Sequence, residues 1–123
     1  LSTGGAASVP RPGGVLKPTD EDVFVYNLGT AAFEATLLID GSKMPGMAVE
    51  DITGIWDDPQ SSDYYITIVG AFNLGGVKGN DKSIVKLTPN GGASVYTPSL
   101  VSWLAAGATL PTGFKIDGIE IAR

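Results

Sequence analysis

Short runs of β-branched and aromatic residues, separated by glycine, proline and asparagine turns, recur along most of the chain. Residues 23–26 (VFVY) and 33–39 (FEATLLI) are two such runs with a turn signal between them, and they predict a β-hairpin. A helix over residues 31–38 is disfavoured, because Gly29 and Gly41 bracket this segment too closely for a stable helix. The first part of the chain therefore predicts strands.

The second half continues the same pattern. The apolar run at 64–69 is the strongest strand prediction in the chain, and residues 83–87 (SIVKL) alternate sides as a strand requires. Residues 89–92 (PNGG) predict a tight turn, since Asn-Gly accepts a positive φ at low cost. Further strands are expected at 48–56, 71–72 and 93–96. Residues 99–106 (SLVSWLAA) predict the only helix, although a single helical turn or another strand fits them as well.

The N-terminal segment, residues 1–18, differs from the rest because it is rich in glycine and proline and nearly free of large apolar groups. Arg11 and Lys17 each precede a proline, which favours an extended backbone. A segment of this composition cannot bury enough apolar area to fold alone. We expect either a flexible linker or tail, or an extended arm that lies on a neighbouring subunit. Residues 19–123 are then expected to form a single β-rich domain.

Together these patterns predict an all-β fold. It would be a small antiparallel β-sandwich or a propeller-blade-like module, with an extended N-terminal arm and at most one short helix. The length of 123 residues suits one domain, and 17 glycines with 8 prolines agree with frequent turns and few helices. Hydrophobic residues make up 43% of the chain, so a modest core can form.

Charge and composition argue against several classes of partner. The formal net charge is −5 and no cluster of Lys and Arg exists, which disfavours nucleic acid and anionic membrane surfaces. No run approaches the ~20 apolar residues of a membrane span, so membrane insertion is not expected. Because the chain has no cysteine, its stability must come from packing, strand pairing or assembly with other chains.

One stretch carries a repeat-like pattern. IVGAF at 68–72, the glycine pair at 75–76, SIVKL at 83–87 and Asn-Gly at 90–91 resemble the delta-60 repeat of β-propeller-like surface and fibre proteins. The resemblance implies a β-rich repeat unit in a surface or fibre protein.

The resemblance extends upstream and covers roughly residues 46–92, followed by the start of a second repeat. Gly46-Met47 and the segment 52–55 (ITGI) are similar to the opening strand of the family repeat. The chain also departs from the family pattern: Lys86 stands where arginine is usual, Ala71 replaces a small residue that is commonly glycine or serine, and the aspartate after the last turn is missing.

An internal echo supports the presence of a repeat. Gly113 follows Gly46 by 67 residues (113 − 46), and residues 113–119 then align with residues 46–52. A period of this order is typical of units that stack or are arranged radially, none of which hides its apolar face alone. One unit and a fragment cannot close a propeller. We therefore expect either a piece of a larger protein or a terminal strand that completes a sheet locally or in a neighbour.

The glycines at 70, 75, 76 and 79 invite comparison with a phosphate-binding loop. Such a loop needs Gly-Lys-Ser/Thr at the start of a helix, so that backbone N–H groups and the helix dipole meet the anion. Here residues 77–80 lie between predicted strands and no helix follows. We expect these glycines to form turns, and no cofactor is predicted.

A weak calcium candidate is the polar loop that contains Asp57, Asp58 and Asp63, because calcium prefers several carboxylate and carbonyl oxygens at short range. The ligand spacing of an EF-hand is missing. A solvated hairpin tip, in which Asp57 or Asp58 caps the turn, is the favoured interpretation. No metal site is therefore predicted.

Catalysis is not expected. Histidine and cysteine are both absent, so Ser-His-Asp and Cys-His arrangements are impossible. A carboxylate pair for glycoside cleavage could be Glu50 with Asp51 or Glu50 with Asp117. Glu50 and Asp51 are neighbours on an expected strand and would point to opposite faces, so they could not flank one bond together, whereas the sequence leaves the pair with Asp117 open. The sequence therefore predicts a protein that is not an enzyme.

Two functions remain open. The first is a structural module of a repetitive assembly, such as a virion decoration, a fibre component or a surface filament, which contacts other copies of itself or other assembly proteins. The second is an adhesin or carbohydrate-binding module of a bacterial surface protein, with a surface glycan as partner. Either places the protein on a virion or at the cell surface. The contact residues expected are Val9, Pro10, Arg11, Tyr64, Tyr65, Trp103 and Phe114.

Overall fold

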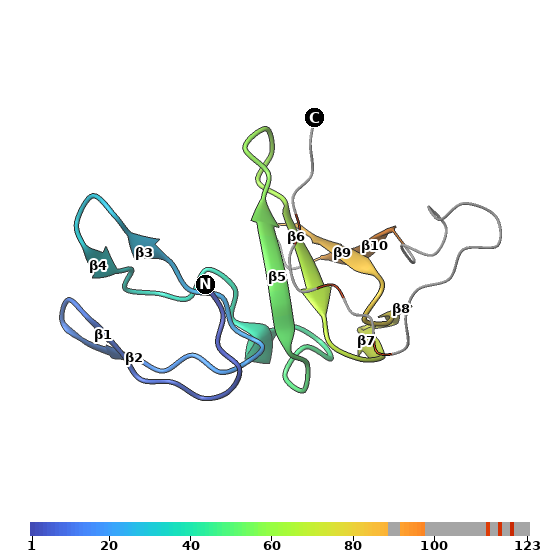
Figure 1. The fold of residues 1–123 in the computed structure, drawn as a ribbon, viewed down its shortest axis with the longest axis horizontal. Coiled ribbons are helices and arrows are strands. Elements are labelled where there is room, and N and C mark those ends of the chain that lie inside the picture. The colour runs from blue at the N-terminus through green and yellow to red at the C-terminus, as the bar shows by residue number, and fades with distance from the viewer. Residues whose placement is uncertain (89–91, 98–112, 114–115, 117–118, 120–123) are drawn as a thin grey trace. The chain divides into compact units, whose positions relative to one another are not determined.

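The computed structural model describes residues 1–88, 92–97, 113, 116 and 119. The chain divides into two compact units, Leu1–Ile52 (unit 1) and Thr53–Arg123 (unit 2). Nearly all elements in the described residues are short strands in antiparallel pairs, and the one helix there is the 3₁₀ turn η1 (Gly41–Lys43) (Figure 1). The predicted all-β fold is confirmed.

Unit 1 contains two hairpins. β1 (Val9–Arg11) pairs with β2 (Gly14–Leu16), and β3 (Tyr26–Asn27) pairs with β4 (Ala32–Phe33). The β1 strand lies beside β4, but the two hairpins are separate two-stranded sheets (Figure 1). The hairpin predicted from residues 23–39 is therefore present, with a shorter ladder than the sequence suggested and a further bridge between Val23 and Ile39.

The first residues of the chain belong to unit 1. Leu1 and Phe24 exchange both backbone hydrogen bonds, with N···O distances of 3.0 and 2.9 Å, as an antiparallel pair does. On its other side, the same short segment exchanges two backbone bonds between Val23 and Ile39. Residues 1–18 thus pair within unit 1 and contain the β1–β2 hairpin. The boundary between the two units follows Ile52, whereas composition suggested a boundary after Pro18.

A small apolar core supports this pairing. The buried hydrophobic side chains of unit 1 are Val9, Val23, Phe24, Ile39, Met47 and Ile52. The ring of Phe33 lies 5.7 Å from the ring of Phe24 and 4.9 Å from that of Tyr26, measured between ring centroids, so β4 is attached to the core through aromatic contacts.

The loop before Val23 is fixed by a buried carboxylate. Asp22 is 3% exposed, and its Oδ2 accepts hydrogen bonds from the backbone N–H and the hydroxyl of Thr19. Its Oδ1 accepts from the backbone N–H of Gly41 at 2.9 Å. This places Gly41 directly against Glu21, with no room for a β-carbon beside the Glu21 carbonyl oxygen.

Replacing Gly41 with alanine is therefore expected to destabilise unit 1 by about 1–3 kcal/mol, the usual range for overpacking a site that cannot yield. The obstruction is partly backbone, so a side-chain rotation cannot relieve it. Urea unfolding measures the change. Gly4→Ala is the matched control, since a β-carbon there meets nothing within 4 Å. Equal stability of the two variants would contradict the close packing of Gly41.

Unit 2 is built on a four-stranded sheet. Its strand order is β10 (Ala93–Thr97), β9 (Ile84–Leu87), β6 (Tyr64–Ile68) and β5 (Ile52–Asp57), whose first residue falls in unit 1. Consecutive neighbours in this order give an up-and-down sheet, and β7 (Phe72–Leu74) and β8 (Val77–Gly79) form a hairpin inserted between β6 and β9. A four-stranded antiparallel sheet is also the unit from which propeller blades are made.

The centre of this sheet is buried on both faces. On β6, residues 65–68 are all at most 2% exposed, and Ile84, Val85 and Leu87 of β9 are also buried. Tyr65 faces Lys86 across the two strands, and Ile66 faces Val85. The strong strand prediction for residues 64–69 reflects this double burial, because a strand covered on both faces has a nearly continuous apolar run.

Gly75 and Gly76 form the turn of the β7–β8 hairpin, as predicted, whereas Gly79, also expected in a turn, is the last residue of β8 and pairs with Phe72, whose ring packs against it. Leu74 pairs with Val77, so the loop consists of Gly75 and Gly76, with φ values of 60° and 103°. Positive φ at both loop positions suits a two-residue hairpin and favours glycine there. The Asn73 side chain accepts a hydrogen bond from the Gly76 N–H at 2.9 Å, which closes the turn further.

Some predictions differ from the structure at the ends of elements. The strand expected at 48–56 begins only at Ile52, because residues 45–49 form turns. Strands β1, β2 and β8 were not predicted. The helix expected at 99–106 lies outside the described residues, as do residues 89–91 of the predicted turn, although the flanking Thr88 and Gly92 are joined by backbone and side-chain hydrogen bonds.

Candidate functional site

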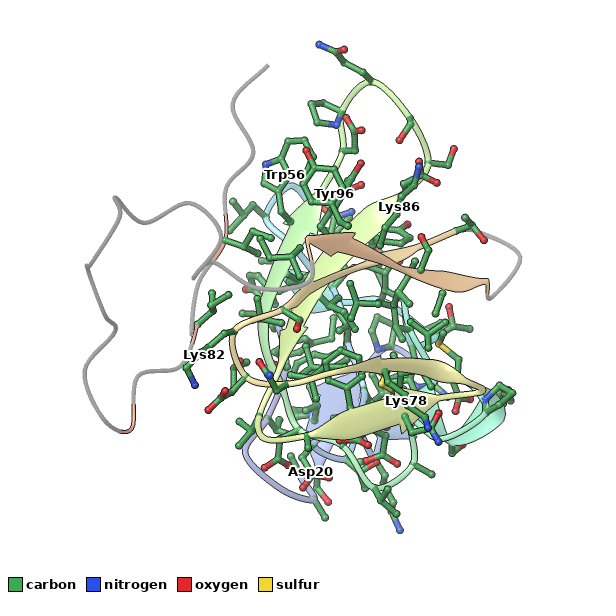
Figure 2. The ribbon with its side chains drawn as sticks, turned by 90° about the vertical axis from the view of Figure 1, so that its right-hand side faces the viewer. Asp20, Trp56, Lys78, Lys82, Lys86 and Tyr96 are labelled. Atoms are coloured by element: carbon green, nitrogen blue, oxygen red, sulfur yellow. The ribbon has the colours of Figure 1, made fainter. Side chains whose placement is uncertain are left out.

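The first candidate site is a row of aromatic rings on the unit 2 sheet. The ring of Tyr65 on β6 lies 5.5 Å from that of Trp56 on β5 and 4.7 Å from that of Tyr96 on β10, measured between centroids. Figure 2 labels Trp56 and Tyr96. Tyr65 is 2% exposed and belongs to a buried cluster with Ile84 and Ile116, against which Trp56 also packs. Tyr96, in contrast, is 46% exposed. The row therefore presents one accessible ring on a rigid base.

Tyr96 lies on the same face of the sheet as Tyr65, because Ser94, two residues earlier, pairs with Lys86, which in turn pairs with Tyr65. Val95 pairs with Val85 and Thr97 pairs with Ile84, so the register shifts between them and Tyr96 has no direct partner on β9. Tyr96 meets Tyr65 edge to face, at an interplanar angle of 80°.

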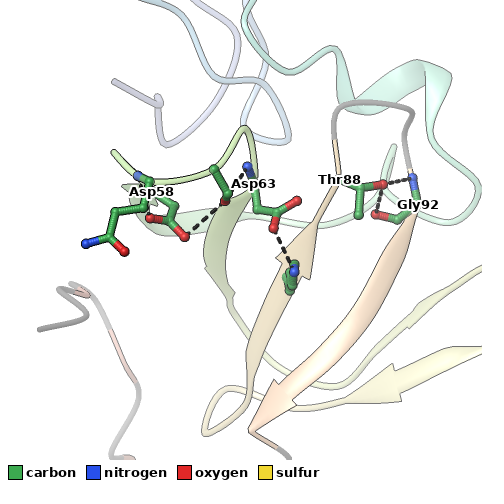
Figure 3. Close-up of polar contacts among 7 residues, drawn as sticks. Asp58, Asp63, Thr88 and Gly92 are labelled. Carbon is green, nitrogen blue, oxygen red and sulfur yellow. Dashed lines mark hydrogen bonds and ion pairs between the residues drawn. The ribbon is translucent and has the colours of Figure 1, made fainter. Parts of the chain in front are cut away.

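The second candidate is the loop between β5 and β6, which contains the three aspartates considered for calcium. Asp58 is 1% exposed, and its carboxylate accepts hydrogen bonds from the Gln60 N–H at 3.0 Å and the Ser61 hydroxyl at 3.0 Å (Figure 3). The Asp58 N–H also donates to the carbonyl of Asp63 at 3.1 Å, which closes the loop. Asp58 therefore caps the turn, as the favoured interpretation of the sequence held.

Asp63 has a different partner. Its carboxylate lies 2.7 Å from the Nζ of Lys86 on β9, while Asp57 is exposed (Figure 3). The three carboxylates thus do not converge on one point. Within the residues that the structure describes, no group of three acidic side chains is arranged to hold a metal ion.

Removing the Asp58 carboxylate is expected to destabilise the protein by about 1–3 kcal/mol, because the loop loses two hydrogen bonds to a charged, buried acceptor. Asp58→Ala, compared with Asp57→Ala in urea unfolding, measures this effect. The neighbouring Asp57 is exposed and serves as the control. A thermal melt of the wild-type protein with millimolar calcium chloride should match the melt in chelator. A melting temperature raised by calcium would contradict the turn-capping role.

The third candidate is an acidic loop in unit 1, where Asp20, Glu21 and Asp22 are consecutive. A hydrogen bond from Asp51, and a second from Glu21, hold the pKa of Asp20 below its usual value. In the adjoining η1 turn, Lys43 lies 2.7 Å from the carboxylate of Asp40 and lowers the pKa of Asp40 in the same way. The carboxylates of Asp22 and Asp40 thus serve the local loop and turn, through Thr19 and Gly41 in one case and through Ser42 and Lys43 in the other.

A fourth feature is the apolar surface of unit 1. All residues of this unit are described, and seven large hydrophobic side chains are at least 36% exposed. Leu28, in the turn between β3 and β4, is 87% exposed, and Val15 on β2 is 53% exposed. The others are Leu1, Val25, Tyr26, Leu38 and Val49. Four of the seven lie on or next to the two hairpins, namely Val15, Val25, Tyr26 and Leu28, and Leu38 lies beside the bridge between Val23 and Ile39.

The contact residues expected from the sequence are distributed unevenly. In β1, Val9 is 8% exposed and packs in the core of unit 1, whereas Pro10 is exposed and Arg11 half-buried. In β6, Tyr64 is half-buried, but Tyr65 is buried and is not available to a partner. Trp103 and Phe114 lie outside the described residues. Tyr96 was one of several aromatic residues of interest in the sequence but was not among the contact residues chosen from it. Leu28 was missed, because it lies in a polar turn signal.

Comparison of the chain with protein-family models, with curated proteins and with solved structures gives no match. The similarity to the delta-60 repeat stays a prediction from the sequence. Within the described part of the chain, no helix is long and apolar enough to cross a membrane.

Proposed function

We propose that the protein is a non-catalytic structural module of a repetitive assembly, such as a virion decoration, a fibre component or a surface filament. Its copies would be held together by arm and strand contacts between subunits. The observation that carries this proposal is the group of exposed apolar side chains on the hairpins of unit 1. The setting we propose, a virion or a cell surface, follows from the resemblance to a repeat of surface proteins.

The hairpins of unit 1 are poorly supported on their own. Each is a separate two-stranded sheet with two or three residues per strand, and hairpins of this size have marginal stability in water. Single exposed hydrophobic residues are ordinary, but their concentration on one part of a molecule is typical of interaction surfaces. A neighbouring copy that covers Val15, Tyr26 and Leu28 would stabilise both the hairpins and the assembly.

The non-catalytic part of the proposal rests on side chains that are already engaged. The buried carboxylate of Asp58 caps a turn, that of Asp22 fixes a loop, and Asp63 is paired with Lys86. With no histidine or cysteine in the chain, Ser-His-Asp and Cys-His arrangements cannot form.

Light scattering over a concentration series tests the assembly. We expect the wild-type mass to rise to a defined oligomer or a growing filament. The double variant Val15→Lys/Leu28→Lys should need at least about tenfold more protein to assemble, because burying such side chains contributes about 1.5–3 kcal/mol each. Ser62→Lys/Ala71→Lys adds the same charge at exposed positions of unit 2 and should leave assembly unchanged. A wild-type monomer at every concentration would refute the proposal.

One observation favours a second function, recognition of a surface glycan. Tyr96 presents an exposed ring that Tyr65 holds from behind, and rigid aromatic rings are common contact residues for ligands with an apolar face. Tyr96 would then take the role that the sequence suggested for Tyr64 or Tyr65.

A glycan array with the purified protein tests this second function. Tyr96→Ala should abolish any glycan signal, because it removes the only ring of the row that is largely accessible among the described residues. Tyr26→Ala is the matched control, since Tyr26 is a 39% exposed tyrosine in unit 1. Equal glycan binding by Tyr96→Ala and wild type, or no binding by either, would count against a glycan site at Tyr96.

A further inference from the structure

We propose that the glycan site at Tyr96 takes a neutral pyranose. The apolar face of the sugar stacks on the Tyr96 ring, and its hydroxyls bond to the Asp63–Lys86 ion pair beside that ring. This inference rests on the second proposed function, glycan recognition. It adds the class of sugar and the polar side chains that orient it.

The Asp63–Lys86 ion pair lies on the same face of the unit 2 sheet as the aromatic row. Lys86 of β9 pairs directly with Tyr65 of β6 and with Ser94 of β10, so its side chain points to the face of Tyr65. The Asp63 carboxylate reaches this face, since it lies 2.7 Å from the Lys86 Nζ. Tyr96 is a diagonal neighbour of Lys86 across β9 and β10, and Figure 2 shows both in the upper part of the view. At such a separation a long side chain and an aromatic ring come within reach of one another.

A ligand can reach all three groups. Tyr96 is 46% exposed, and the side chains of Lys86 and Asp63 are 33% and 17% exposed. Behind the Tyr96 ring, Tyr65 and Trp56 form a packed aromatic support. A ring that is already held in place loses little conformational freedom when a ligand binds.

The chemistry of these groups matches that of a pyranose. One face of a pyranose ring is formed largely by C–H groups, which pack on an aromatic ring, and the hydroxyls project from its edge. A carboxylate accepts hydrogen bonds and an ammonium group donates them, so the Asp63–Lys86 pair serves both roles of a hydroxyl. Sites for small molecules commonly combine an apolar surface with a few polar groups that fix the orientation of the ligand.

Charge favours a neutral sugar over an acidic one. The positive charge of Lys86 is already balanced by Asp63. The loop of residues 57–63 contains three carboxylates and no cation, and the bond from the Asp58 N–H to the Asp63 carbonyl draws its two ends together. The ion pair therefore borders an acidic loop, which repels the carboxylate of an acidic sugar.

A site with one exposed ring binds a single sugar weakly. Repetition of the site along an assembly raises the effective affinity for a glycan-covered surface, because each further contact becomes intramolecular. Binding to one chain is therefore best measured by a method that detects weak complexes, such as the shifts of amide signals in NMR spectra.

Titration of the wild-type protein with methyl pyranosides tests the class of sugar. The probes are methyl β-glucoside, methyl β-galactoside and methyl β-mannoside, together with the uronide of the one that binds best, which has a carboxylate in place of the hydroxymethyl group. We expect the neutral probes to differ in affinity and the uronide to bind at least about tenfold more weakly than its neutral counterpart. A uronide that binds as tightly would overturn the assignment of a neutral sugar.

The double variant Asp63→Asn/Lys86→Gln tests the orienting role, because it removes both charges and keeps polar side chains of similar size. The best neutral probe should bind at least about tenfold more weakly, since hydrogen bonds to charged groups are lost. The preference among the three neutral probes should also disappear, since a ring alone does not fix the orientation of a sugar. Asp40→Asn/Lys43→Gln, an ion pair of the same length in unit 1, is the matched control and should leave binding unchanged.

The preference among probes separates an orienting role from a structural one. A folded Asp63→Asn/Lys86→Gln variant that keeps the wild-type preference would overturn the inference and leave a glycan site at Tyr96 standing. Absence of wild-type binding both to these probes and on the glycan array would overturn the inference and the glycan function together.

Deoxy analogues of the best neutral probe provide a test without substitutions in the protein. Removing a hydroxyl that faces the ion pair should weaken wild-type binding at least about tenfold, whereas removing a hydroxyl that faces solvent should have little effect. Equal binding of every deoxy analogue would overturn the role of the ion pair.

Discussion

Backbone hydrogen bonding on both sides of the Val23–Phe24 segment is the interaction on which unit 1 depends. Phe24 pairs with Leu1 on one side and Val23 pairs with Ile39 on the other, so two residues join three distant parts of the sequence. Asp22 directly precedes this segment. Its carboxylate accepts hydrogen bonds from Thr19 and Gly41 and so fixes the backbone that leads into Val23. The hairpins extend from this junction and are otherwise isolated two-stranded sheets, which is why they depend on whatever covers them.

In unit 2 the central strands are instead supported within a single four-stranded sheet. β6 and β9 are each paired on both sides, and their side chains are buried on both faces, so no comparable dependence on a partner arises at the sheet centre. The aromatic row adds to this rigidity, because Tyr65 packs against Trp56 and Tyr96 at once. A chain with one self-sufficient sheet and one poorly covered pair of hairpins is suited to a module whose first part is completed by a neighbour.

The sequence predicts the central sheet well and unit 1 poorly, for physical reasons. The run at 64–69 and the Gly75-Gly76 turn are local signals, since continuous apolar character and paired glycines each act within a few residues. The fold of residues 1–18 follows from a pairing between Leu1 and Phe24 that no local pattern encodes. The buried state of Tyr65 and the exposure of Tyr96 likewise depend on contacts between strands, which period-two alternation alone does not reveal.

The two segments of the internal echo, which begin at Gly46 and Gly113, can be compared at the positions that the structure describes. Gly46 and Gly113 have nearly the same φ, 80° and 78°, so both positions take the left-handed backbone that favours glycine. Three residues later the copies differ: Ile116 is 8% exposed and packs with Tyr65 and Ile84, whereas Val49 is 88% exposed. The unit 2 sheet therefore covers Ile116, whereas the equivalent Val49 is exposed. If the echo marks a repeat, a preceding unit or a neighbouring subunit that supplies a sheet would cover Val49, which agrees with the assembly proposed from the hairpins.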